Sequence, residues 1–215
     1  MENNEQNGPS SQESESNLID KVKQFYKLDF KNIFILFFKN PIEGIYSVLE
    51  KPSEKSYSHS LILFASVFVL YIIGGYVIFG EGIRRADVSY INIGLFPVIM
   101  MLIISSLSFA IKSISGKPNF KNELLTGALC GIALALIVPV LLIIKIFLED
   151  NIYRLIRNPL EVGVVGTLLL FYVILMLINV FQQSLKSSGT KDAFAWYLSP
   201  ASILLAFYIT IQIFF

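Results

Sequence analysis

The sequence predicts an all-α, polytopic membrane protein: a bundle of five transmembrane helices with an N-terminal interfacial amphipathic arm. The first observation is composition, because 54% of the 215 residues are apolar and only 15% are charged, whereas a soluble domain has about 25% charged residues. The second is a series of long apolar runs, at 60–79, 89–111, 125–147, 160–181 and 194–215. A helix needs about 20 residues to cross the hydrocarbon, and backbone groups in lipid must pair within their own segment. The runs therefore predict a transmembrane domain over residues 60–215.

The chain before these runs divides into two parts. Residues 1–16, MENNEQNGPSSQESES, contain almost no apolar side chains. They cannot bury enough surface to offset the entropy lost on ordering, so we expect a disordered tail. Residues 17–59 instead mix lysines with large aromatic side chains, and we interpret them as a cytoplasmic juxtamembrane amphipathic segment.

This juxtamembrane segment has the pattern of a helix that lies on a membrane. Ile19, Val22 and Phe25 recur at helical spacing, while lysines occupy the other faces. Such a helix places its lysines near anionic headgroups and inserts its aromatic rings into the lipid boundary. The candidate contacts with lipid or a partner are Lys21, Lys23, Phe25, Lys27, Phe30, Lys31, Phe34, Phe37 and Phe38. The alternative is a small soluble helical subdomain.

The third apolar run combines small residues with a proline. Gly127, Gly131 and Ala135 follow one another at four-residue spacing, and Pro139 comes four residues later. Small residues at this spacing form a flat stripe that lets helices approach closely, and proline removes a backbone hydrogen bond and kinks the helix. We favour a packed and kinked helix. The alternative is a broken helix that forms a substrate or ion site.

Polar residues inside the last two runs allow two interpretations. Asn179 and Gln183 lie near one face of the fourth run, and Gln212 lies in the fifth. Such groups usually form hydrogen bonds between helices. They also suit a hydrated path through a small transporter or channel component near the kinked third helix. Ion and proton paths usually contain a charged group, and no run has one near its middle.

The inventory of reactive residues argues against catalysis. The chain has one cysteine, Cys130, and one histidine, His59, which excludes a disulfide framework and a multi-histidine metal site. No nucleophile with a neighbouring base is apparent. We therefore expect no enzymatic activity, no metal and no cofactor. A net charge of +1 gives no reason to expect nucleic acid, so the expected partners are membrane lipids and other membrane proteins, including a second copy of the chain.

Basic residues between the runs predict the orientation. The N-terminal side carries seven lysines close to the runs, and the opposite side carries four arginines, or five basic residues with Lys145. Basic residues are more frequent in cytoplasmic loops. The bias therefore predicts a cytoplasmic N-terminus and a C-terminus on the far side. The seven lysines counted on the same side of the membrane as the N-terminus are Lys51, Lys55, Lys112, Lys117, Lys121, Lys186 and Lys191.

The order of these parts resembles the Yip family of membrane proteins, in its prokaryotic branch. The similarity covers roughly residues 30–215 and includes Asn40-Pro41 before the first run, then Gly131 and Pro139 in the third. The eukaryotic branch's Asp-Leu-x-Gly-Pro segment is absent. Eukaryotic members act in vesicle trafficking and contact Rab-type GTPases. The resemblance implies a non-enzymatic protein of a bacterial inner membrane that acts through association with other membrane proteins or lipids, in a membrane-organising or trafficking-like role.

Overall fold

The fold is that of a computed structural model, which describes residues 19–20, 22–50, 56–80, 89–115, 118–149 and 159–214. The predicted disordered tail, 1–16, and the candidate contact Lys21 lie outside the described residues. Every regular element in the described part is a helix. The long helices are α4 (Ser56–Phe79), α6 (Tyr90–Ser115), α7 (Phe120–Ala135) followed by α8 (Ile137–Glu149), α10 (Pro159–Ser187) and α11 (Asp192–Phe214).

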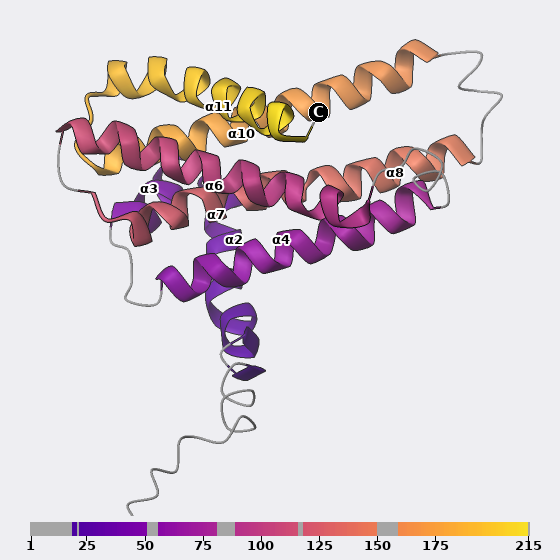
Figure 1. The fold of residues 1–215 in the computed structure, drawn as a ribbon, viewed down its shortest axis with the longest axis horizontal. Helices are drawn as coiled ribbons and strands as arrows, with labels where there is room; N and C mark the ends of the chain where they lie inside the picture. Colours follow the sequence, from indigo (N-terminus) through magenta and orange to yellow (C-terminus); the bar gives the residue numbers. More distant parts are fainter. Residues whose placement is uncertain are drawn as a thin grey trace, which may run out of the picture.

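The long helices lie side by side and alternate in direction (Figure 1). Five segments are long and apolar enough to cross a bilayer, with α7 and α8 together making the third. The predicted fold class, an all-α polytopic bundle, is confirmed. The chain is a multi-pass membrane protein.

The helices extend beyond the predicted runs, mostly at one end of the bundle. There, α6 continues from the predicted 111 to Ser115, α7 starts at Phe120 instead of 125, and α10 continues from 181 to Ser187. The predicted limits follow side-chain polarity, whereas the backbone needs only its i→i−4 hydrogen bonds to remain helical. Polar residues that were predicted to lie in connections therefore belong to helices of the bundle.

The third transmembrane segment is broken one turn before Pro139. Helix α7 ends at Ala135, and α8 begins at Ile137. Proline cannot donate a hydrogen bond to the carbonyl four residues earlier, which here is that of Ala135. The Tyr71 hydroxyl of α4 donates a hydrogen bond of 2.7 Å to the neighbouring Leu134 carbonyl, so a side chain from another helix satisfies backbone exposed by the break.

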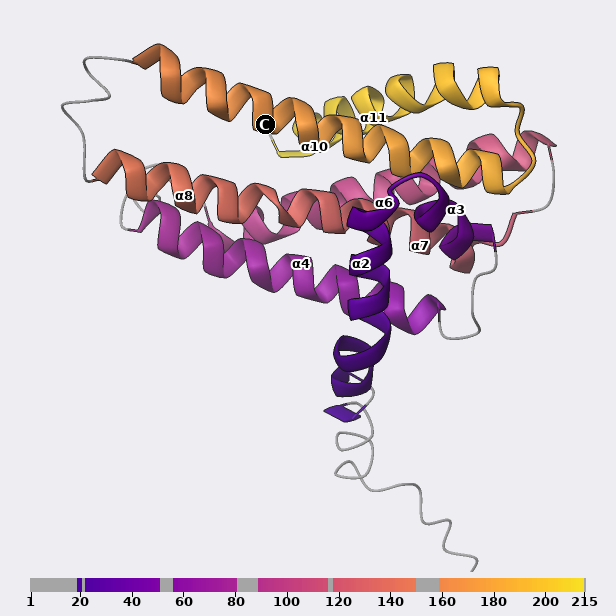
Figure 2. The same cartoon turned by 180° about the vertical axis from the view of Figure 1, so that it is seen from behind.

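The N-terminal part forms three short helices: η1 (Phe25–Phe30), α2 (Lys31–Lys39) and α3 (Glu43–Glu50). We call Phe25–Glu50 the arm. It runs across the long helices, and α3 lies close to one end of the bundle (Figures 1 and 2), which we call the arm end. The first of the three is a π-helix, a rare form that is frequent at functional sites.

Candidate functional site

The arm is attached to α4 by its first helix. The Phe25 ring is buried and lies 4.8 Å from the His59 ring, measured between centroids. The Asp29 Oδ2 atom lies 3.2 Å from His59 Nε2, and the hydroxyls of Tyr26 and Ser66 are hydrogen-bonded. An ion pair, a ring contact and a hydrogen bond thus hold η1 against the first half of α4.

A second attachment joins the arm to α10. The Asn179 Nδ2 atom donates a hydrogen bond of 2.7 Å to the Pro41 carbonyl, in the turn between α2 and α3. Gln183 Nε2 donates to Asn179 Oδ1 over 3.3 Å. Two of the predicted intramembrane polar residues therefore hold the arm. Gln212, the third, is exposed on α11, and it lies toward the other end of the bundle because α10 and α11 are antiparallel (Figure 1).

Between these attachments the arm packs into the hydrophobic core. Phe37 of α2 and Ile45 of α3 are buried and lie close to Leu129 of α7. The arm therefore shares one core with the long helices and has no separate core of its own. Phe25 and Phe37 are each only 1% exposed, so they contact protein and do not insert into lipid. For these two residues the expected lipid contact is wrong.

The outward side of the arm carries the other candidate contacts. Lys27 and Lys31 are exposed, and so is Lys23 just before the arm. Phe34 and Phe38 are 40% and 39% exposed, and their ring centroids lie 4.6 Å apart. Phe30 is partly buried, and its ring lies 5.7 Å from that of Phe34. The arm therefore presents lysines and aromatic rings together on the surface that the protein leaves uncovered.

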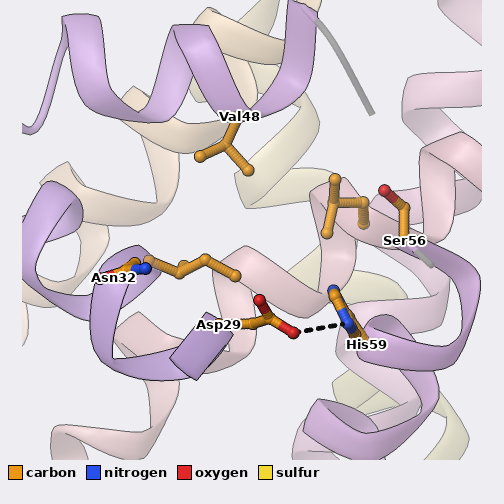
Figure 3. Close-up of a pocket in the computed structure, with 7 residues that line it drawn as sticks. Asp29, Asn32, Val48, Ser56 and His59 are labelled. Carbon is orange, nitrogen blue, oxygen red and sulfur yellow. Dashed lines mark ion pairs between the residues drawn. The ribbon is translucent and has the colours of Figure 1, made fainter. Parts of the chain in front are cut away.

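A cleft of about 220 Å³ lies where the arm meets α4 and α7. The ion-paired Asp29 and His59 point toward one another at its edge (Figure 3). Apolar side chains from α2, α3 and α7 close the rest of the cleft. Its lining residues are Asp29, Asn32, Ile33, Val48, Ser56, His59 and Leu125.

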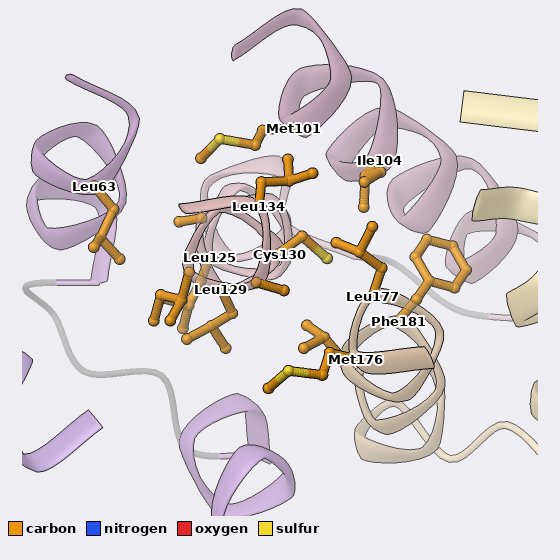
Figure 4. Close-up of a cluster of buried hydrophobic side chains, with 14 of the residues drawn as sticks. Leu63, Met101, Ile104, Leu125, Leu129, Cys130, Leu134, Met176, Leu177 and Phe181 are labelled. Carbon is orange, nitrogen blue, oxygen red and sulfur yellow. The ribbon is translucent and has the colours of Figure 1, made fainter. Parts of the chain in front are cut away.

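Helix α7 is the centre of the bundle under the arm, with α4, α6 and α10 packed around it (Figure 4). Every residue from Glu123 to Leu134 is buried. A Cβ atom added to Gly127 would lie 2.3 Å from the Met101 carbonyl oxygen, and one added to Gly131 would lie 2.5 Å from Met101 Cε. These two positions of the small-residue stripe thus contact α6 directly, while Ala135 is partly buried at the end of α7.

A buried polar cluster joins α6, α7 and α10 at the arm end. The Lys112 Nζ atom lies 3.0 Å and 2.8 Å from the two carboxylate oxygens of Glu123, and 2.8 Å from Ser184 Oγ. Ser108 donates to the same carboxylate over 2.6 Å, and the Thr126 and Ser184 hydroxyl oxygens are 2.7 Å apart. All five side chains are buried. The cluster ties three helices together at one point.

This cluster was not among the sites predicted from the sequence. Lys112 was predicted to lie in a connection, as one of the basic residues that set the orientation, whereas in the structure it lies inside α6 and in an ion pair. One signal was present: Ser108 and Lys112 are four residues apart, and Glu123 and Thr126 are three apart, so each pair falls on one helix face. Nothing in the sequence shows that the two faces meet.

Within the described part of the chain, no group of three or more histidine, cysteine, aspartate or glutamate residues is placed to hold a metal ion. No family model, curated protein or solved structure matches the chain.

Proposed function

We propose that this chain is a non-enzymatic, multi-pass membrane protein whose arm lies in the cytoplasmic surface of a bacterial inner membrane. In this proposal the arm associates with lipids and with other membrane proteins, in a membrane-organising role like that of the Yip family's prokaryotic branch. One observation carries the proposal: the arm runs across the long helices (Figure 1) and presents exposed Lys27 and Lys31 beside exposed Phe34 and Phe38.

One of the arm's two contacts with α4 supports a position at a membrane surface. At a rise of 1.5 Å per residue, His59 lies about 5 Å from the start of α4 and Ser66 about 15 Å. Interfacial helices bury their apolar face about 5–10 Å into the headgroup boundary, so the His59 contact falls within this depth and the Ser66 contact lies deeper. Lysine side chains at this depth reach the headgroups by extending their methylene stems through the boundary.

The charges on the arm favour anionic lipids as its partners. A lysine near an anionic surface contributes about 1 kcal/mol to membrane attraction. The arm is already held by the bundle through the Asp29–His59 and Asn179–Pro41 contacts, so little ordering entropy opposes lipid contact. A transporter would need Asn179, Gln183 and Gln212 on one path, and these residues are not brought together, so we favour the lipid-associating role.

Depth measurements with spin labels test the proposal. The native Cys130 is buried, and Cys130→Ala provides a background for single cysteines at Lys27, Lys31, Phe34 and Phe38. In liposomes containing anionic lipid, labels at 34 and 38 should be relaxed by oxygen, and labels at 27 and 31 by a water-soluble nickel complex. A label at the exposed Leu204 of α11 gives the deep reference. Labels at 34 and 38 that respond only to the nickel complex would overturn the proposal.

Changing the lysines tests the choice of lipid. Lys27→Gln combined with Lys31→Gln should reduce the enrichment of anionic lipid around the protein in mixed bilayers, because two exposed charges are removed. These point changes are cleaner than deletion of the arm, since deletion would also remove the buried Phe25 and Phe37. Lys191→Gln, at the exposed α10–α11 connection, is the matched control. Equal enrichment in all three proteins would contradict the proposed charge contact.

A further inference from the structure

The cleft beneath the arm has the size of a polar headgroup. Its volume of about 220 Å³ corresponds to about seven water molecules at ~30 Å³ each, which is too small for a whole lipid. Five helices line it: η1 and α2 on one side, α3 above, and the first turn of α4 with Leu125 of α7. The arm and the bundle therefore line this open cleft together.

The lining of the cleft carries an anionic group and no lysine or arginine. Asp29 Oδ2 pairs with His59, but a carboxylate has two oxygens and about four acceptor sites, so Asp29 retains capacity for a further donor. Asn32 and Ser56 add side-chain amide and hydroxyl groups, while Ile33, Val48 and Leu125 are apolar. This combination suits an ammonium group carried on a short methylene chain.

The proposed depth of the arm indicates which molecule carries such a group. Lys27 and Lys31 are exposed on the arm, and the cleft lies between the arm and the bundle. At headgroup depth the ligand within reach of the cleft is a lipid headgroup. A phospholipid with a primary-amine headgroup has its ammonium at the end of two methylene groups, next to the phosphate.

We propose that the cleft binds the headgroup of a phospholipid that carries a primary amine, with the ammonium on Asp29. The headgroup then bridges the arm and the bundle, because the lining residues come from both. The inference rests on the proposed function, since it requires the arm to lie at headgroup depth.

Lipid binding to the full-length protein tests this site. Native mass spectrometry in detergent compares added dioleoyl phosphatidylethanolamine with dioleoyl phosphatidylcholine, whose headgroup nitrogen has no N–H to donate. The wild-type protein should bind the ethanolamine lipid about tenfold more tightly, the factor expected for one charge-assisted hydrogen bond. Asp29→Asn should remove that preference. Asp20→Asn, at an exposed position outside the cleft lining, should retain it.

A second variant tests the cleft without removing the Asp29–His59 contact that positions the arm. Asn32→Leu fills the cleft without changing the Asp29–His59 pair, and it should also weaken ethanolamine-lipid binding. The spin label at Phe34 reports whether the arm remains in place in each variant. Equal affinity for the two lipids, or an unchanged preference in Asp29→Asn, overturns the site. If the labels at 34 and 38 still lie in lipid, the proposed function survives that result; if they do not, both proposals fail.

Discussion

The two ends of the bundle are held together in different ways. At the arm end, three features bind four helices to one another. They are a buried ion pair, the close Gly127–Met101 contact and the crossing arm. At the other end, α8 and α10 diverge (Figure 2). Val164 and Leu168 of α10 and Ile146 of α8 are more than half exposed there.

Toward that other end Gly74 of α4 packs closely on Val138, and the hydrogen bonds described there involve residues near helix termini. Lys145 Nζ donates to the Val77 carbonyl over 2.7 Å, and the Tyr90 hydroxyl donates to the Gly80 carbonyl over 2.5 Å. In lipid the hydrophobic effect does not draw helices together, so close packing and hydrogen bonds decide where they associate. The contacts at the arm end should therefore contribute most of the stability of the bundle against unfolding. Three substitutions test this expectation.

Removing one partner of the buried ion pair should have the largest effect. Glu123→Ala leaves the Lys112 ammonium buried without its carboxylate, which costs about 3–5 kcal/mol. Unfolding in mixed detergent and SDS, followed by circular dichroism, measures the loss. Lys145→Met is the matched change at the other end and should cost less. Replacing both partners, with Lys112→Met and Glu123→Leu, should recover much of the stability. An equal loss for Glu123→Ala and Lys145→Met would contradict the asymmetry.

A methyl group added at the helix contact should have an intermediate effect. In Gly127→Ala the new Cβ meets the Met101 carbonyl oxygen at 2.3 Å, so α6 and α7 must separate, at a cost of about 1–3 kcal/mol. The control is Gly166→Ala on α10, where the nearest atom is 3.8 Å from the new Cβ. That change should be neutral or slightly stabilising, because alanine favours helix. The same unfolding assay compares the two, and similar losses would refute the difference in packing.

The smallest effect is expected at the break between α7 and α8. Tyr71→Phe removes the hydroxyl that caps the Leu134 carbonyl, and hydrogen bonds between helices in membranes average about 0.6 kcal/mol. Tyr208→Phe, at an exposed position on α11, should leave stability unchanged. If Tyr71→Phe unfolds at the same point as the wild-type protein, the hydroxyl does not stabilise the break.

The sequence predicted the elements of the transmembrane domain well and the arm only in part. The five long helices follow from the length of the apolar runs, and the break follows from Pro139, because both are properties of consecutive residues. The spacing of Gly127 and Gly131 likewise indicated a close contact. The arm's lysines are on the outside as expected, but helical spacing alone did not distinguish the buried Phe37 from the exposed Phe38.

Local sequence thus determined the five long apolar segments of the described chain, where the third one breaks, and that the chain lies in a membrane, because backbone hydrogen bonding in lipid is settled within each segment. Only the tertiary structure decided that the arm crosses the bundle, that Asn179 holds it, and that Lys112 meets Glu123 and Ser184. These contacts join residues on different helices. Their energies depend on which helix faces meet, and that is a property of the packed bundle and not of any single run.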